Sequence, residues 1–193
     1  MYRILTLFAA SLTCCMAADL PVDYLGQAPD FMVYGDQTKG AFVTCTLDAP
    51  DRLVCDVVPE GWGSGFAMPA GKTLVRDGGK AGNLSGAKHL VLRCQAAKGM
   101  RYVVTLEESG CAAQGPLSGE AGAEGEACQS VELAGTSKIQ NETIDISALL
   151  PNRNHGNQKG KHIVDVQAVG SIGLRFSSGQ PAGKITITSL RVE

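Results

Sequence analysis

The sequence predicts an all-β protein. Short runs rich in β-branched residues recur between clusters of Gly, Pro and Asp, and the 193 residues include 24 glycines and 8 prolines. The chain holds no long stretch in which apolar residues repeat with the period of a helix. We therefore expect short antiparallel strands joined by turns, with no linker and no internal repeat.

Each expected strand is a run of β-forming residues that ends at a turn signal. The expected strands span residues 31–34, 41–47, 52–57, 89–95, 101–107, 129–133, 138–146, 171–176 and 184–192. The one helix candidate is a single turn at residues 147–150.

Alternation within three of these strands separates an apolar face from a polar face. The apolar positions are Leu90, Leu92, Cys94, Tyr102, Val104, Leu106, Ile172, Leu174 and Phe176. The opposite positions include Arg93, Gln95, Thr105, Glu107 and Arg175. If the strands share a sheet, this polar set lies on one outer face. It is then either a ligand-binding face or a solvated face with cross-strand ion pairs.

The last strand changes phase before the chain ends. Ile185 and Ile187 alternate on one face, whereas Leu190 and Val192 have the opposite parity. All four side chains can be buried only if a β-bulge turns the strand over. We therefore predict a bulge near residues 188–189.

The N-terminus predicts an exported protein. Residues 1–18 have the pattern of a signal peptide, because Arg3 precedes an apolar stretch at residues 4–12 and small residues follow up to Ala18. The apolar stretch is too short to span a bilayer. We expect residues 19–193 to form one secreted domain.

The charge balance argues against two kinds of partner. The chain has 17 basic and 19 acidic residues, a formal net charge of −2. Nucleic-acid binding and docking to anionic lipid both need basic patches. We expect neither nucleic acid nor membrane as a partner.

The cysteines predict two disulfides and one unpaired thiol. Outside the predicted signal peptide, the cysteines are Cys45, Cys55, Cys94, Cys111 and Cys128. A tight hairpin would place Cys45 opposite Cys55. A bridge from Cys111 to Cys128 would close the Gly- and Ala-rich loop between them. Cys94 then remains as a buried thiol, and no cysteine spacing matches a zinc site.

Six ordered segments carry a resemblance to a known family. They are EGWGSGFAM, NLSGAKHLVLRCQA, GMRYVVTLEES, NETIDISALLPNR, VGSIGLRFSS and AGKITITSLRVE. Their order and spacing resemble the galactose-binding-like jelly rolls, in particular family 11 carbohydrate-binding modules and the related complex I assembly-factor type domain. The resemblance implies a two-sheet antiparallel β-sandwich that binds an oligosaccharide or polysaccharide without catalysis.

Trp62 is the one tryptophan in the chain and matches an aromatic position of that family. There, an aromatic-Gly segment before the long loop helps to form the glycan platform, and Trp62 with Gly63 falls at the same place. A ring stacked on the apolar face of a sugar supplies affinity, while polar side chains hold the hydroxyls. A tryptophan between glycines could equally be a core anchor in a tight loop.

The polar loop PNRNHGNQKGKH, residues 151–162, matches a basic loop beside the family's cleft. The resemblance implies that ligand-binding side chains come from Arg153, Asn154, His155 and Asn157. A long polar loop can also be a solvated connection between strands.

The sequence departs from the family at two places. The family's final strand carries an Asp-Asn pair whose Asp helps to hold a structural calcium, and Thr188 and Ser189 stand there instead. We therefore expect no metal and no other cofactor. The glucan-binding modules line their concave face with tyrosines, whereas the outward positions here are Arg, Gln, Thr and Glu. Either the ligand differs or this face binds none.

Two classes of function fit these observations. The first is a secreted non-catalytic protein that binds carbohydrate through Trp62 and the polar face. The second is an extracellular structural or adhesive β-sandwich protein without a sugar site, acting alone or in an assembly. An enzyme is not expected, because Glu107 and Glu108 point to opposite faces of one strand and no other catalytic motif is present.

Two sequons for N-linked glycosylation occur in the chain. They start at Asn83 (Asn-Leu-Ser) and at Asn141 (Asn-Glu-Thr). Either asparagine would be glycosylated only in a eukaryotic secretory route. The two sequence motifs do not distinguish which asparagine carries a glycan.

Overall fold

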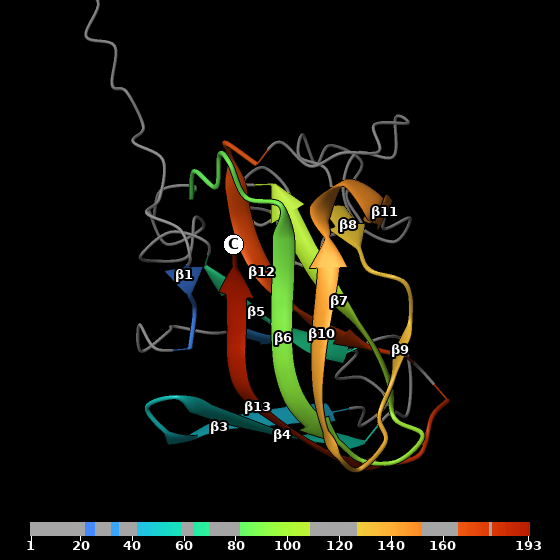
Figure 1. Ribbon diagram of the computed structural model, residues 1–193. Coiled ribbons are helices and arrows are strands. Elements are labelled where there is room, and N and C mark those ends of the chain that lie inside the picture. Colours follow the sequence, from blue (N-terminus) through green and yellow to red (C-terminus); the bar gives the residue numbers. More distant parts are fainter. Residues whose placement is uncertain are drawn as a thin grey trace, which may run out of the picture.

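A computed structural model describes residues 22–25, 32–34, 42–58, 64–69, 82–108, 127–151, 166–177 and 179–193. These residues form two antiparallel sheets with the hydrophobic core between them (Figure 1). The predicted all-β sandwich is thus confirmed. Within the described residues, no helix is long and apolar enough to cross a membrane. The predicted signal peptide, residues 1–18, lies outside them.

Sheet A has six strands. Its path runs β10 (Ile139–Asp145), β6 (His89–Ala96), β13 (Gly183–Val192), β4 (Arg52–Val58) and β3 (Phe42–Ala49), and β1 (Val22–Asp23) also pairs with β13. In Figure 1, β13, β6 and β10 lie side by side at the front. Among the described strands, β10 therefore forms one edge of sheet A.

Sheet B has seven strands. Its path runs β11 (Leu150–Pro151), β8 (Ala127–Gln129), β7 (Arg101–Glu108), β12 (Val169–Phe176), β5 (Ser64–Pro69) and β2 (Met32–Tyr34), and β9 (Leu133–Ala134) also pairs with β7. The central strands β7 and β12 are paired over almost their whole length.

The core confirms the predicted alternation within strands. Leu90, Leu92 and Cys94 of sheet A point inward and meet the inward side chains of sheet B, which include Tyr102 and Phe176. Burying one large apolar side chain stabilises a fold by about 1.5–3 kcal/mol. Burial of the apolar side chains on the inward faces of these strands therefore stabilises the packing of the two sheets.

The predicted bulge in the last strand is also confirmed. The pairing register of β13 with β6 shifts between Ile187 and Ser189. As a result Ile187 and Leu190 are both fully buried although their parities differ. Beyond the bulge, β13 changes partner from β4 to β1, and the Ser189 hydroxyl donates a hydrogen bond to Oδ2 of Asp23 at 3.1 Å.

Three strands were not expected from the sequence, namely β1, β5 and β11. The strand β5 has the sequence SGFAMP, which contains no β-branched residue and so has a low intrinsic strand preference. It forms a strand because β12 and β2 pair with it from both sides. Tertiary pairing here overrides the local preference.

Two expected elements have different bounds. The strand expected at residues 129–133 is two strands, β8 and β9, because the Ser130 hydroxyl interrupts the ladder by accepting the N–H of Val104 at 3.0 Å. The helical turn expected at residues 147–150 is a short 3-10 helix at Ile146–Ala148, since Leu150 already belongs to β11.

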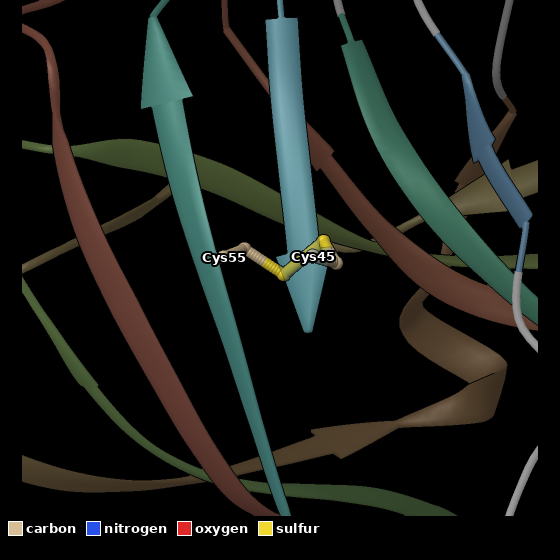
Figure 2. The surroundings of a disulfide bond; sticks show 2 residues. All are labelled: Cys45 and Cys55. Carbon is tan, nitrogen blue, oxygen red and sulfur yellow. A yellow bond between two sulfur atoms is a disulfide. The ribbon is translucent and has the colours of Figure 1, made fainter. Parts of the chain in front are cut away.

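The predicted bridge between Cys45 and Cys55 is present (Figure 2). The two residues are directly opposite in the β3–β4 hairpin, with their Cα atoms 4.1 Å apart. The bridge faces the core, where Cys55 is fully buried.

Of the other three cysteines outside the predicted signal peptide, the structure describes two, Cys94 and Cys128. Cys94 is a buried free thiol, as predicted, and its Sγ lies 3.3 Å from the hydroxyl oxygen of Tyr102. Burial raises the pKa of this thiol, which keeps it protonated and inert. Cys128 is buried in β8, but Cys111 lies outside the described residues, so the bridge between these two stays a prediction.

Candidate functional site

A group of polar side chains occupies the outer face of sheet B. In β7, the inward side chains alternate with Thr105 and Glu107, which face outward. The register places Thr105 opposite Gln129 of β8, and Glu107 opposite Ser171 of β12. Arg175 of β12 has the same parity as Ser171. We call Thr105, Glu107, Gln129, Ser171 and Arg175 the sheet-B polar face.

Four of the five side chains of this face form two hydrogen-bonded pairs. Nη2 of Arg175 donates to Oε1 of Gln129, so the guanidinium reaches from β12 across β7 to β8. The Ser171 hydroxyl donates to Oε2 of Glu107 at 3.1 Å. Thr105 lies between the two pairs and is only 2% exposed. The four paired side chains are thus held in fixed directions.

Glu107 has an unusual electrostatic environment. Burial raises the pKa of its carboxyl group, while the hydrogen bond from Ser171 and the positive charge of Arg175 act in the opposite direction. Desolvation has the largest effect. A carboxyl group in this state can accept hydrogen bonds and, when protonated, can also donate one.

An apolar side chain borders the polar face. Leu150 of β11 lies opposite Gln129 and is 48% exposed. A half-exposed leucine beside fixed polar groups offers a surface for the apolar face of a ligand. The sequence pattern did not indicate Leu150, because β11 has two residues and shows no alternation.

Two further members of the site were also missed. Gln129 and Ser171 were included in expected strands but were not assigned to a face. Their parity relative to Cys128 and Ile172, which are buried, was the signal that could have identified them.

The expectation that all five outward polar residues share one face is wrong. Arg93 and Gln95 belong to β6 in sheet A, whereas Thr105, Glu107 and Arg175 belong to sheet B. The turn between β6 and β7, in which Gly99 has a φ of 79°, carries the chain from one sheet to the other. Parity assigns a side chain to a face of its own strand, but it does not say which sheet the strand joins.

Arg93 and Gln95 lie on the outer face of sheet A, on the opposite side of the sandwich. Both side chains are exposed. Nε2 of Gln95 donates to the carbonyl oxygen of Ser137 at 2.9 Å. Neither side chain can join a ligand site built on the outer face of sheet B.

Three predicted site residues, Trp62, Arg153 and His155, lie outside the described residues, as do Asn154 and Asn157. Trp62 precedes β5 by two positions, and Arg153 follows β11 by two positions. Both adjoining strands belong to sheet B. The roles of these residues in ligand binding stay predictions.

The final strand uses its two hydroxyl side chains locally. Oγ1 of Thr188 donates to the carbonyl oxygen of Arg93 at 3.4 Å, and Ser189 bonds Asp23. In the described ranges, no three His, Cys, Asp or Glu side chains gather to hold a metal ion. The expectation that no structural calcium is bound stays a prediction.

Sequence comparison and structural comparison give different results. No protein-family model matches the chain, and no curated protein matches its sequence. The structure is similar to the family 11 carbohydrate-binding module of a cellulosomal cellulase of Clostridium thermocellum, with a TM-score of 0.62, 11% identity, and coverage of 92% of this chain and 95% of the module.

Two other solved structures extend this result. A family 11 module from Clostridium thermocellum in complex with a beta-1,3-1,4-mixed-linked tetrasaccharide has a TM-score of 0.57 and 9% identity over 86% of this chain and 88% of its own. A family 29 module has a TM-score of 0.51 and 10% identity over 91% of this chain and 92% of its own. The likeness to the complex I assembly-factor type domain stays a prediction. The chain has the β-sandwich jelly-roll fold of the family 11 and family 29 carbohydrate-binding modules.

Proposed function

We propose that this protein is a secreted, non-catalytic carbohydrate-binding protein that holds an oligosaccharide or polysaccharide on the sheet-B polar face. The observation that carries the proposal is the hydrogen-bonded polar group across β8, β7 and β12. An outer sheet face usually displays flexible, solvated side chains. Here two hydrogen bonds, from Ser171 to Glu107 and from Arg175 to Gln129, fix these side chains, so their polar atoms are preorganised for a ligand.

Each part of the face has a chemical role in this proposal. Arg175 and Gln129 present planar groups whose N–H donors can bind sugar hydroxyls. Glu107 accepts a hydroxyl hydrogen with the carboxylate oxygen that Ser171 does not occupy. Leu150 packs against the apolar face of a sugar ring. The fold supports this assignment, since the family 11 module of similar structure was solved with a tetrasaccharide.

Trp62, Arg153 and His155 complete the proposed site. Their strand neighbours, β5 and β11, flank the polar face within sheet B. Trp62 would supply a stacking surface, and the two basic side chains would bind hydroxyls at the rim.

The absence of catalysis in this proposal rests on the number of carboxyl groups. Hydrolysis of a glycosidic bond commonly requires two carboxyl groups that face each other across the bond. Among the described residues of the sheet-B polar face, Glu107 is the one carboxyl group. Its neighbour Glu108 has the opposite parity and pairs with Val169.

Export is supported by two features. The sequence begins with the pattern of a signal peptide. The core also contains the disulfide between Cys45 and Cys55, and disulfides persist mainly in oxidising compartments.

A glycan array probed with residues 19–193 tests the proposal. The key variant is Arg175→Ala, and the matched control is Arg93→Ala, which removes an exposed arginine from the outer face of sheet A. We expect Arg175→Ala to reduce affinity for the array hits by about tenfold or more, because a fixed charged donor is lost. Arg93→Ala should leave affinity unchanged.

The variant Trp62→Ala separates the two functions that the sequence left open. Loss of glycan binding with an unchanged circular dichroism spectrum supports the carbohydrate-binding protein. A blank array for the unaltered protein, together with unfolding of Trp62→Ala, would instead support the structural or adhesive protein.

A further inference from the structure

The two sequons of the chain lie in different surroundings. Asn141 is in β10, the edge strand of sheet A, and its side chain is exposed. Asn83 lies in the turn before β6 and is half-buried. The structure can therefore distinguish two sites that have equivalent sequence motifs.

Asn141 has space for a large modification. It lies opposite Arg93 of β6, whose exposed side chain is also on the outer face of sheet A. Thr143, the third residue of the sequon, is exposed on the same face. Asn141 makes no side-chain hydrogen bond in the part of the chain that the structure describes. A group attached to its amide nitrogen would displace only water.

Asn83 is already used by the fold. Its Oδ1 accepts hydrogen bonds from the backbone N–H of Ser85 at 3.0 Å and from the Ser85 hydroxyl at 2.6 Å. The middle residue of the sequon, Leu84, is only 1% exposed and belongs to the core. The preceding residue, Gly82, forms a β-bridge with Val169. A large group at Asn83 would therefore disturb a packed turn.

A large apolar side chain is exposed beside Asn141. Ile139, two residues earlier on the same face of β10, is 60% exposed. An edge strand that displays a large apolar side chain is a place where two copies of a protein can associate through their edges. A hydrophilic group beside Ile139 would shield both the side chain and the strand edge.

We propose that Asn141 is an acceptor for an N-linked glycan and that Asn83 is not. The glycan covers Ile139 and the edge of β10. It projects from the outer face of sheet A, so it does not cover the sheet-B polar face on the other side of the sandwich. This inference rests on the proposed export but not on the proposed ligand.

The test uses the full chain in a eukaryotic secretion host, with glycopeptide mapping of the protein collected from the medium. Collection from the medium separates a failure of export from a failure of glycosylation. We expect glycan on Asn141, unmodified Asn83, and one mass shift that an N-glycosidase removes. Secreted protein with an unmodified Asn141, or with glycan on Asn83, would overturn the assignment.

Variants at Thr143 provide the matched control. Thr143→Ala destroys the sequon and leaves Asn141 in place, whereas Thr143→Ser keeps the sequon with a similar exposed side chain. Thr143→Ala should lose the mass shift and Thr143→Ser should keep it. The unglycosylated Thr143→Ala protein should also self-associate more strongly in analytical ultracentrifugation. Adding Ile139→Thr should reverse this association, and persistence of the association would contradict the shielding role of the glycan.

Discussion

The outer faces of the two sheets arise from the same sequence pattern but have different properties. On sheet A, Lys184 of β13 and Asp56 of β4 are directly opposite, their Nζ and Oδ1 atoms are 3.5 Å apart, and both side chains are 61% exposed. On sheet B, Thr105 and Ser171 are almost fully buried, and Ser171 bonds Glu107. Alternation of polar and apolar residues thus produces either a solvated face or a fixed polar group.

This difference has an energetic consequence. An exposed ion pair contributes little because water and salt screen it. A buried polar group is costly unless it is hydrogen-bonded, so the loss of one partner penalises the other. We therefore expect equivalent substitutions on the two faces to have unequal effects.

The largest effect is expected when a carboxyl group is replaced by an amine. Glu107→Lys places a second positive charge near Arg175 in a buried site, which should lower the free energy of unfolding by about 3–5 kcal/mol. Asp56→Lys opposes Lys184 on the exposed face and should cost about 1 kcal/mol or less. Urea unfolding followed by circular dichroism measures both. Equal losses in the two variants would show that the faces do not differ.

An intermediate effect is expected from pH. Burial raises the pKa of Glu107 above its ordinary value of 4.5, so the folded protein holds this proton more tightly than the unfolded chain. The free energy of unfolding contributed by Glu107 is therefore highest below that value and falls as the pH rises through the folded-state pKa. Glu107→Gln should remove this fall.

Asp145 at the end of β10 supplies the comparison. Hydrogen bonds from the side chain and backbone of Ser147 hold the pKa of Asp145 below its ordinary value of 3.8. The contribution of Asp145 to the free energy of unfolding is therefore present above that value and is lost as the pH falls through the folded-state pKa. Urea unfolding between about pH 3 and about pH 7 gives the slope of the free energy of unfolding against pH. Glu107→Gln and Asp145→Asn should change this slope in opposite directions. Slopes that change in the same direction would refute the assignment.

The smallest effect is expected on the exposed face of sheet A. Lys184→Ala removes the pair with Asp56 and should change the free energy of unfolding by about 0.5 kcal/mol or less. The difference from the unaltered protein should disappear in about 1 M NaCl, where charges are screened within a few ångströms. A larger effect that persists in salt would mean that this face is not simply solvated.

The site was only partly predictable from the sequence. Thr105, Glu107 and Arg175 were found because each alternates with buried apolar neighbours within one strand. Arg93 follows the same rule and was placed with them wrongly. Its local pattern is indistinguishable from that of Arg175, and only the pairing of β6 with β10 and β13 separates the two arginines.

By itself, the sequence determined the features that depend on neighbouring residues. These are the inward faces of β6, β7 and β12, the bulge in β13 and the bridge between Cys45 and Cys55, which are 10 residues apart in one hairpin. The tertiary structure decided which strands are neighbours. The contact from Arg175 to Gln129 spans 46 residues, and that from Ser171 to Glu107 spans 64. Alternation is a property of a single strand, whereas strand pairing depends on contacts between distant segments, so no local pattern could specify the sheet-B polar face.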